Sequence, residues 1–211
     1  MKRFILITLA LFAGMQLFAQ RNADFGLIAG GASYFGEINP VRPFYKPSPA
    51  IGGFYRLNFN KRFSARVNTT FISLKGDASD FSGQREYHYL QNTSFSSSFV
   101  EVCGQAEFNF IDYITGDSKY LSSTYIAGGI GYLFPKKGIV IPFSVGAKVN
   151  LGERLSMGAE LSFRKTFTDE IDENANPLDN TFMNNNDWYS IFGLFISYKF
   201  VKFAADCPVY N

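Results

Sequence analysis

The sequence predicts an all-β fold, namely an eight-stranded antiparallel transmembrane β-barrel of the outer-membrane type with a short C-terminal tail. Three observations predict it. Apolar and polar residues alternate with a period of two along most of the chain, as in strands with two unlike faces. The alternating runs are about 10–16 residues long, whereas a typical strand of a globular domain has about 5 or 6. The links between runs alternate between short and long, which is typical of periplasmic turns and extracellular loops.

Residues 1–19 are predicted to be a secretory signal peptide that is not part of the fold. Lys2 and Arg3 give a positive start, residues 4–18 are almost all apolar, and Ala19 ends a small-residue cleavage site. The apolar stretch is short for a membrane-spanning helix, so a retained anchor is the weaker alternative. No cysteine follows the cleavage site, which argues against a lipid-anchored protein.

Composition excludes some function classes. Without Lys2 and Arg3 the chain has 18 basic and 18 acidic residues and no basic run, so nucleic acid is a poor candidate partner. Aromatic residues make up 18% of the chain, including 24 Phe and 12 Tyr. That share is high for a soluble domain and ordinary for a barrel with aromatic girdles. No later stretch is long and apolar enough to predict a transmembrane helix.

The eight strands are expected, in order, at residues 24–36, 50–59, 63–75, 94–110, 120–134, 138–151, 154–167 and 187–200, within a barrel domain of residues 20–203. Short turns separate them near residues 59–62, 111–119 and 151–154, and longer loops near residues 37–49, 76–93 and 168–186, with 135–138 as a short exception. Backbone groups in lipid must all be paired, so the sheet is expected to close. A soluble sandwich or a lipocalin-like barrel would show the same alternation and remains the alternative.

The sixth run shows the pattern most clearly. Odd-numbered residues from Ile139 to Leu151 are all apolar, and the even-numbered residues between them include Ser144, Lys148 and Asn150. Pro142 lies within this run and removes one ladder hydrogen bond. We expect a local bulge to absorb it.

The interior of an eight-stranded barrel is just wide enough to be filled by side chains. Residues in the polar phase of the strands therefore face one another. Seven of them are charged, namely Arg56, Arg66, Glu101, Glu107, Lys148, Glu160 and Arg164. These four cations and three anions need partners, because an isolated buried charge is costly. The sequence predicts a salt-bridged plug and no open channel.

The sequence offers only weak candidates for catalytic, ion-conducting or metal-binding residues. Catalytic or ion-conducting carboxylates at Glu101, Glu107 and Glu160 are the alternative to structural pairs, but no histidine or second nucleophile accompanies them. His88, the single histidine, lies in a long loop without a nucleophile elbow, so an outer-membrane enzyme is the third choice. The acidic loop of residues 169–179 lacks the glycine and the ligand spacing of an EF-hand. No catalytic residue, cofactor or metal site is predicted.

Six stretches resemble the PorG family of small outer-membrane barrels of the type IX secretion system. They are GLIAGGASYFGEINP, YRLNFNKRFSARV, EVCGQAEFNF, PFSVGAKVNL, GAELSFRKTFTDEID and CPVYN, and they span nearly the whole chain after the signal peptide. The resemblance implies a non-catalytic scaffold that ties a periplasmic ring to the outer membrane. A PorK-like lipoprotein and a PorN-like protein would form that ring. The alternative is a stand-alone small barrel with a structural or adhesin role.

The C-terminal residues 204–211 are expected to form a periplasmic tail, since an even number of strands puts both termini in the periplasm. Cys103 is expected in the lumen, on the order of 18 Å above the inner end of its strand, whereas a disulfide requires Cα atoms within about 7 Å. Cys207 is therefore expected to form an intermolecular disulfide in the oxidising periplasm. The lipoprotein would be its partner, with Pro208 and Tyr210 as further contacts. A Cys103–Cys207 bond or free thiols remain alternatives.

Overall fold

The computed structural model describes residues 23–35, 44–77, 94–117, 119–167 and 188–199. Its strands are β1 (Ala23–Phe35), β2 (Ser48–Asn58), β3 (Phe63–Asp77), β4 (Ser94–Asn109), β5 (Ser122–Phe134), β6 (Gly138–Asn150), β7 (Leu155–Thr166) and β8 (Trp188–Lys199). Every predicted strand is confirmed, and each boundary lies within two residues of the expected one. Within these residues no helix is long and apolar enough to cross a membrane.

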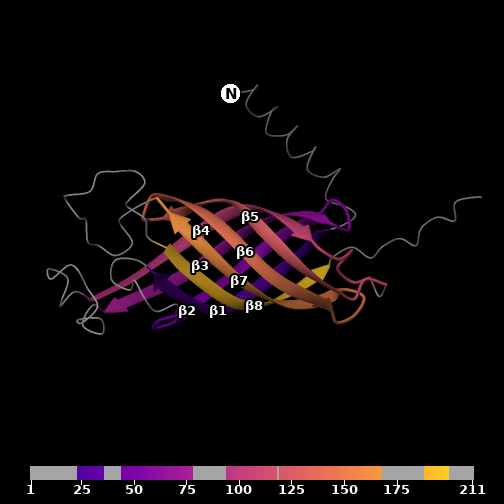
Figure 1. Cartoon of the computed structure of the whole chain (residues 1–211), viewed down its shortest axis with the longest axis horizontal. Helices are drawn as coiled ribbons and strands as arrows, with labels where there is room; N and C mark the ends of the chain where they lie inside the picture. The colour runs from indigo at the N-terminus through magenta and orange to yellow at the C-terminus, as the bar shows by residue number, and fades with distance from the viewer. Residues whose placement is uncertain (1–22, 36–43, 78–93, 118, 168–187, 200–211) are drawn as a thin grey trace, which may run out of the picture.

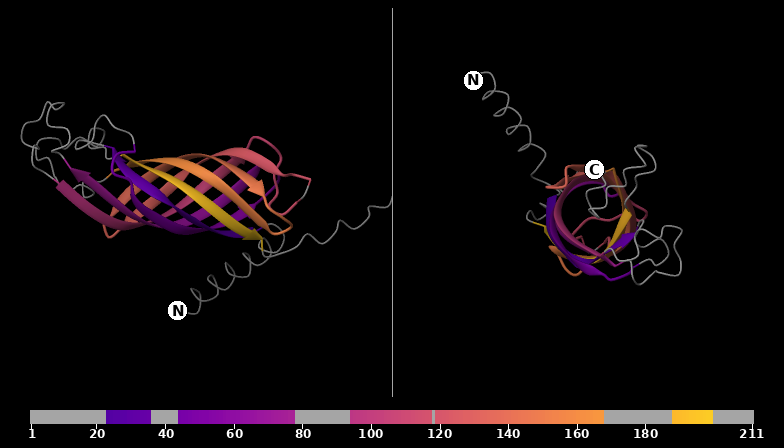
Figure 2. Two further views of the ribbon diagram at one scale, coloured as in Figure 1. Left: turned by 90° about the horizontal axis from the view of Figure 1, so that it is seen from below. Right: turned by 90° about the vertical axis from the view of Figure 1, so that its left-hand side faces the viewer.

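The eight strands form one closed antiparallel barrel in which each strand pairs with its sequence neighbours. Closure is made by β1 and β8, whose register runs from Asp24 opposite Lys199 to Phe35 opposite Trp188. Figure 1 shows the strands inclined to the long axis of the barrel, and the right-hand view of Figure 2 shows the ring that they enclose. The predicted closure is thus confirmed, and a two-sheet sandwich is excluded.

The barrel has two unlike ends, which we call the turn end and the loop end. The turn end carries the start of β1, the end of β8 and the links of residues 59–62, 110–121 and 151–154. The loop end carries the links of residues 36–47, 78–93, 135–137 and 167–187. The predicted alternation holds for most links, with residues 135–137 as the short exception, but the turn-end link of residues 110–121 is as long as the loop-end link of residues 36–47.

Large apolar side chains face outward on all eight strands. One example from each strand, in order, is Leu27, Ile51, Val67, Val102, Ile130, Ile141, Phe163 and Leu194, all of them exposed. The alternate residues point inward and include most of the buried charged side chains. This polarity is the reverse of that of a water-soluble barrel, whose exterior is polar.

The polarity changes at the loop end, where β3 and β4 extend beyond their neighbours (Figure 2, left). The register of β3 with β2 ends at Ile72, and that of β4 with β5 begins at Val100. The outward residues of this extension are polar, namely Ser73, Lys75, Ser96 and Ser98. Apart from the buried Ser97, the large inward side chains are apolar. They belong to a buried cluster of Ala32, Tyr34, Ala50, Ile72, Leu74, Phe95, Phe99, Leu133, Val140, Tyr189 and Ile191. The lumen is therefore packed with apolar side chains at this end.

Pro142 interrupts the ladder between β5 and β6, but the strands keep their register on both sides of the gap at Gly129 and Ile130. The N–H of Asn150 donates to the carbonyl of Leu121 at 2.8 Å, so the even-numbered residues of β6 bond toward β5. Pro142 is one of these residues and has no N–H to donate. The expected bulge is therefore wrong, because the ladder omits pairs and neither strand gains a residue.

Candidate functional site

Several predicted features lie outside the described residues. They are the signal peptide, the tail with Cys207, Pro208 and Tyr210, the loop histidine His88 and the acidic loop of residues 169–179. The site that the structure describes is the barrel interior together with the turn that closes it.

All seven predicted ionic residues lie inside the barrel. They come from β2, β3, β4, β6 and β7, and none exposes more than 3% of its surface. They are arranged in three groups along the barrel, each built around one or more carboxylates, which we call the turn-end, middle and loop-end groups. Between them, each buried carboxylate has at least one cationic partner.

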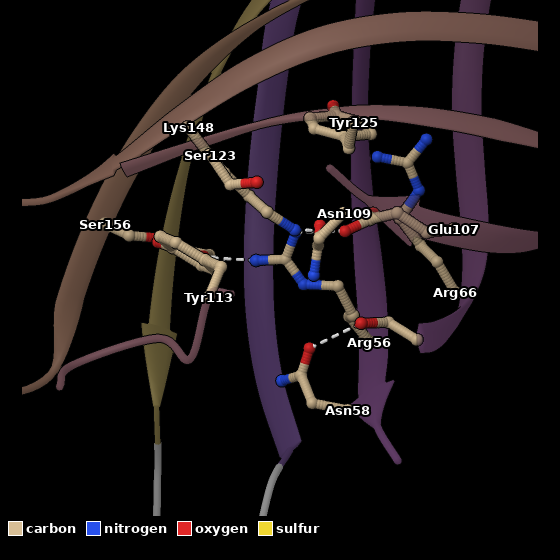
Figure 3. Close-up of polar contacts among 12 residues, drawn as sticks. Arg56, Asn58, Arg66, Glu107, Asn109, Tyr113, Ser123, Tyr125, Lys148 and Ser156 are labelled. Carbon is tan, nitrogen blue, oxygen red and sulfur yellow. Dashed lines mark hydrogen bonds and ion pairs between the residues drawn. The ribbon is translucent and has the colours of Figure 1, made fainter. Parts of the chain in front are cut away.

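The turn-end group joins two carboxylates and two cations, of which Figure 3 labels Arg56, Glu107 and Lys148. Arg56 Nε and Nη2 donate to Asp24 Oδ2 at 3.0 and 2.5 Å, and Asn58 Nδ2 donates to Asp24 Oδ1 at 2.7 Å. The remaining Arg56 nitrogen lies 3.5 Å from Glu107 Oε1. Lys148 forms an ion pair with that same Glu107 oxygen. Each charge is therefore held by partners from other strands, as buried ions require.

The middle group is centred on Glu160. Its Oε2 accepts hydrogen bonds from Arg66 Nη1 at 2.7 Å and from the Tyr125 hydroxyl at 2.6 Å. The other Arg66 nitrogens donate to Gln105 Oε1, at 2.6 Å for Nη2 and 3.2 Å for Nε. The Arg66 guanidinium also lies 5.5 Å from the centre of the Phe54 ring. The cation is thus surrounded by a carboxylate, an amide and an aromatic face.

The loop-end group is centred on Glu101. Arg164 Nε lies 3.0 and 2.8 Å from its two oxygens, and the Tyr189 hydroxyl donates to Oε2. The thiol of Cys103 donates to Oε1 at 3.4 Å. Cys103 is a free cysteine with only 2% of its surface exposed. Its sulfur is therefore inside the barrel wall and out of reach of any partner outside.

The link of residues 110–121 folds under the barrel and closes the turn end. Asn150 of β6 holds it, since its amide nitrogen donates to the carbonyls of Ile114, Asp117 and Tyr120. The Asn150 Oδ1 accepts from the Tyr113 hydroxyl at 2.7 Å and from the Gly116 N–H at 3.0 Å. Gly116 has a φ of 79°, which a side chain would disfavour.

Tyr113 is the residue that this turn inserts into the lumen. It exposes 1% of its surface, and its ring lies 4.7 Å from Lys148 Nζ, beside the turn-end group in Figure 3. Burial raises the pKa of Tyr113, so the hydroxyl stays neutral and can donate to Asn150. The turn thus closes the lumen at this end of the barrel.

Sequence reasoning missed two charges and the tyrosines. Asp24 and Lys199 are buried beside the turn end, so the charged lumen residues in the described part of the chain number five cations and four anions. Asp24 could have been found from its phase with Gly26 and Ile28 in β1. That phase was hard to read, because both faces of β1 carry small or apolar residues.

The arrangement can hold the strands together through ion pairs but leaves little space for a substrate or ligand. A small cavity between Arg66, Asn68, Glu160 and Arg164 has room for about one water molecule (about 10 Å³). Among the described residues no three His, Cys, Asp or Glu side chains gather in a way that would hold a metal ion. The described interior is a packed core in which every carboxylate has a cationic partner.

A closed antiparallel barrel with an apolar exterior and an ion-paired interior is the class of protein that this geometry defines. The chain belongs to the DUF6089 family, described as a domain of unknown function, whose model matches residues 2–209. No sequence among curated proteins matches the chain.

Solved structures of similar architecture include three bacterial barrels. Neisserial surface protein A shares 10% identity and a TM-score of 0.49, covering 84% of this chain and 97% of its own. The outer membrane protein OprG of Pseudomonas aeruginosa shares 8% and 0.47, covering 86% and 98%. The N-terminal β-barrel domain of OprF from the same species shares 11% and 0.42, covering 84% and 98%. Support for placing this barrel in a membrane must therefore come from its own surface.

Proposed function

We propose that the chain is a sealed scaffold in the bacterial outer membrane, with the turn end and both termini in the periplasm. The observation that carries the proposal is the apolar belt on all eight strands around a charged interior. On β6 the outward residues are apolar from Ile139 to Leu151. At about 3.3 Å per residue and a tilt of about 40°, that stretch rises about 30 Å, the thickness of a hydrocarbon core.

Aromatic side chains near both ends of the belt support this placement. Trp188, Tyr132 and Phe134 are exposed near the loop end, and Tyr55 and Tyr198 near the turn end. Tyrosine and tryptophan are enriched at the two interfaces of membrane barrels, where one part of the ring is apolar and the other wet. The belt and its rims thus match a bilayer at both boundaries.

The interior supports a scaffold without a pore or a catalytic site. The three ion-paired groups, the apolar cluster at the loop end and Tyr113 at the turn end fill the described lumen. Carboxylates paired with guanidinium, ammonium and tyrosine hydroxyl groups are suited to holding strands together, because each of the four has a cationic partner.

The particular scaffold role that we propose is anchoring of a type IX secretion machine. The support is the resemblance to the PorG family across six stretches, four of which lie wholly or mainly in β1, β4, β6 and β7. The partners would be a PorK-like lipoprotein and a PorN-like protein that form a periplasmic ring. The tail with Cys207, Pro208 and Tyr210 would contact them from the periplasmic side, and Cys207 would form a disulfide with the lipoprotein.

The experiment is purification of the tagged chain from native membranes in a mild detergent, followed by identification of the proteins that accompany it. Co-purification of a periplasmic ring with a lipoprotein is expected. Deletion of the chain should also stop secretion of cargo that carries the C-terminal sorting domain. Recovery of the barrel alone, with normal secretion in the deletion strain, would instead favour a stand-alone structural or adhesin barrel.

The disulfide is tested on non-reducing gels of cell envelopes. A reducible band of higher mass is expected for the natural chain and for Cys103→Ser, since the Cys103 thiol is enclosed by the barrel. The band should be lost in Cys207→Ser. A band that survives in Cys207→Ser, or that is absent from the natural chain, rules out this covalent link.

A further inference from the structure

The outer surface of the barrel is hollowed over β4, β5 and β6. The hollow has a volume of about 290 Å³, and we call it the belt groove. Its lining residues are Phe63, Ala106, Glu107, Phe108, Ile126, Ala127, Gly128 and Phe143. Glu107 contributes only backbone, because its side chain points into the lumen toward Lys148 (Figure 3). The groove therefore presents no charged side chain to its occupant.

Small outward residues on neighbouring strands produce the groove. Ala106 of β4 lies directly opposite Gly128 of β5 in the register, and Gly104 is the next outward residue of β4. A Cβ atom added to Gly104 would meet nothing within 4 Å, and one added to Gly128 would meet only the Pro142 carbonyl oxygen at 3.9 Å. Neither glycine is therefore needed for packing within the barrel, and both leave open space on its outside.

Phenylalanine rings form the walls of the groove. Phe63 and Phe143 each expose about half of their surface, at 53% and 51%, and the Phe63 ring packs against Phe108 with centroids 5.1 Å apart. Phe63 is the first residue of β3, at the turn end, whereas Phe143 lies near the middle of β6. The groove thus runs from the rim of the apolar belt toward its middle.

We propose that the belt groove is a binding site for one acyl chain of a lipid in the periplasmic leaflet. This inference rests on the membrane placement proposed above. The position matches, since a chain of that leaflet runs from the interface to the bilayer midplane, about half of a 30 Å core. The lining matches as well, because the side chains that line the groove are all apolar. At about 290 Å³ the groove is at the small end of ligand sites, which span about 300–1,000 Å³.

A flexible chain fits this shape better than a protein segment. A transmembrane helix packs closely only where small residues let two backbones approach over several turns. Here the small floor is flanked by protruding Phe63, Ile126 and Phe143, all of them exposed. A single acyl chain can pass between these side chains and fill the floor.

The test uses the purified barrel in vesicles of phosphatidylethanolamine and phosphatidylglycerol with a trace of phosphatidylethanolamine that carries a photoreactive group on one acyl chain. After illumination, mass spectrometry locates the lipid adducts. Labelling of Phe63 and Phe143 should exceed by several-fold the labelling of Phe192 and Leu194 on β8, which are about equally exposed. Equal labelling of the two surfaces would overturn the proposal.

Two variants make the test specific. Gly128→Leu fills the groove without a clash and should remove the excess labelling while the barrel still folds. Gly53→Leu is the matched control, because Gly53 also faces outward on β2 and its added Cβ would meet Phe25 at an ordinary 3.5 Å. It should leave the excess unchanged, whereas an excess that survives in Gly128→Leu would contradict a filled site. A barrel that does not enter vesicles, and so acquires no adducts on either surface, would instead overturn the membrane placement.

Discussion

At the scale of single residues, the buried charged side chains depend on one another. The loss of one partner leaves the other charge buried without compensation. Glu107 shows this most clearly, because it lies between Lys148 and Arg56 and all three side chains are fully buried. Removing one partner of a buried ion pair leaves an uncompensated charge in a low-dielectric interior, which costs more than the pair itself contributes.

Glu107→Gln is therefore expected to destabilise the barrel strongly. Glutamine keeps the shape of the side chain but removes the anion that pairs with Lys148, whereas Arg56 keeps Asp24. The loss of one partner of a buried pair costs about 3–5 kcal/mol. The measurement is the urea midpoint of the folded band in detergent, since folded and unfolded barrels migrate differently in gels.

Asp112→Asn is the matched control for that substitution. Asp112 pairs with Arg62 at 2.5 Å in the turn region, but both side chains are about 40–50% exposed. Surface pairs of this kind contribute about 0–1 kcal/mol, so the midpoint should barely move. Equal losses in the two variants would show that the interior is wetter than its packing implies.

At the scale of elements, one asparagine organises a whole turn. Asn150 makes five hydrogen bonds to residues of the 110–121 link, and this link places Tyr113 under the lumen. Without that side chain, the turn has no comparable fixed partner on β6.

Asn150→Ala should therefore loosen the turn while leaving the strands paired. Lys119, which lies in this turn, offers a trypsin site, and cleavage after it should become much faster in the variant. Ser98→Ala serves as the control, since it removes one exposed hydrogen bond to Ser73 at the opposite end of the barrel. Unchanged cleavage in Asn150→Ala would mean that packing of Tyr113, and not the asparagine, holds the turn.

Pro142 is the other element that invites substitution. Pro142→Val would restore an N–H directed at β5, where Gly129 lies opposite the gap in the ladder. A net hydrogen bond contributes about 0.5–1.5 kcal/mol, and the loss of proline stiffness in the unfolded chain offsets about 0.4–1 kcal/mol of that gain. We expect a small rise in the thermal midpoint. A clear fall would show that the ring packing of Pro142 matters more than the missing donor.

The strands could be predicted from sequence because their two faces meet different surroundings. In β6 and β7 the outward residues lie against lipid in the proposed placement and the inward ones carry charge, so alternation alone located both strands to within one residue. The inward ionic residues followed from the same phase. Which cation meets which carboxylate could not, because the pairs join strands separated by up to 94 residues, as between Arg66 and Glu160.

At the loop end, the inward and outward faces could not be told apart from the sequence, because both are apolar. In β8 the inward residues Tyr189, Ile191 and Phe195 are as apolar as the outward Phe192 and Leu194, so period-two polarity vanishes there. The omission of ladder pairs at Pro142 was also out of reach. It depends on which neighbour the even-numbered residues of β6 bond to, and that direction is a property of the folded sheet.

At the scale of the whole molecule, the barrel is expected to be electrically silent. Its lumen is filled from end to end of the described strands by ion pairs, aromatic rings and aliphatic side chains. Purified protein in a planar bilayer should therefore show no sustained conductance at moderate voltage. A porin in the same bilayer is the positive control, and stable unitary currents from the pure barrel would contradict a sealed lumen.

The polar extension of β3 and β4 creates a barrier to membrane insertion. In the proposed placement, a chain that inserts from the periplasm must carry Ser73, Lys75, Ser96 and Ser98 across the hydrocarbon before these outward residues reach water again. A lysine on the lipid face at the midplane of a barrel costs about 2–4 kcal/mol. This cost arises during insertion and is absent from the folded barrel. Insertion of this hairpin tip should thus be slow in an intact bilayer, and machinery that thins or disturbs the membrane locally would speed it.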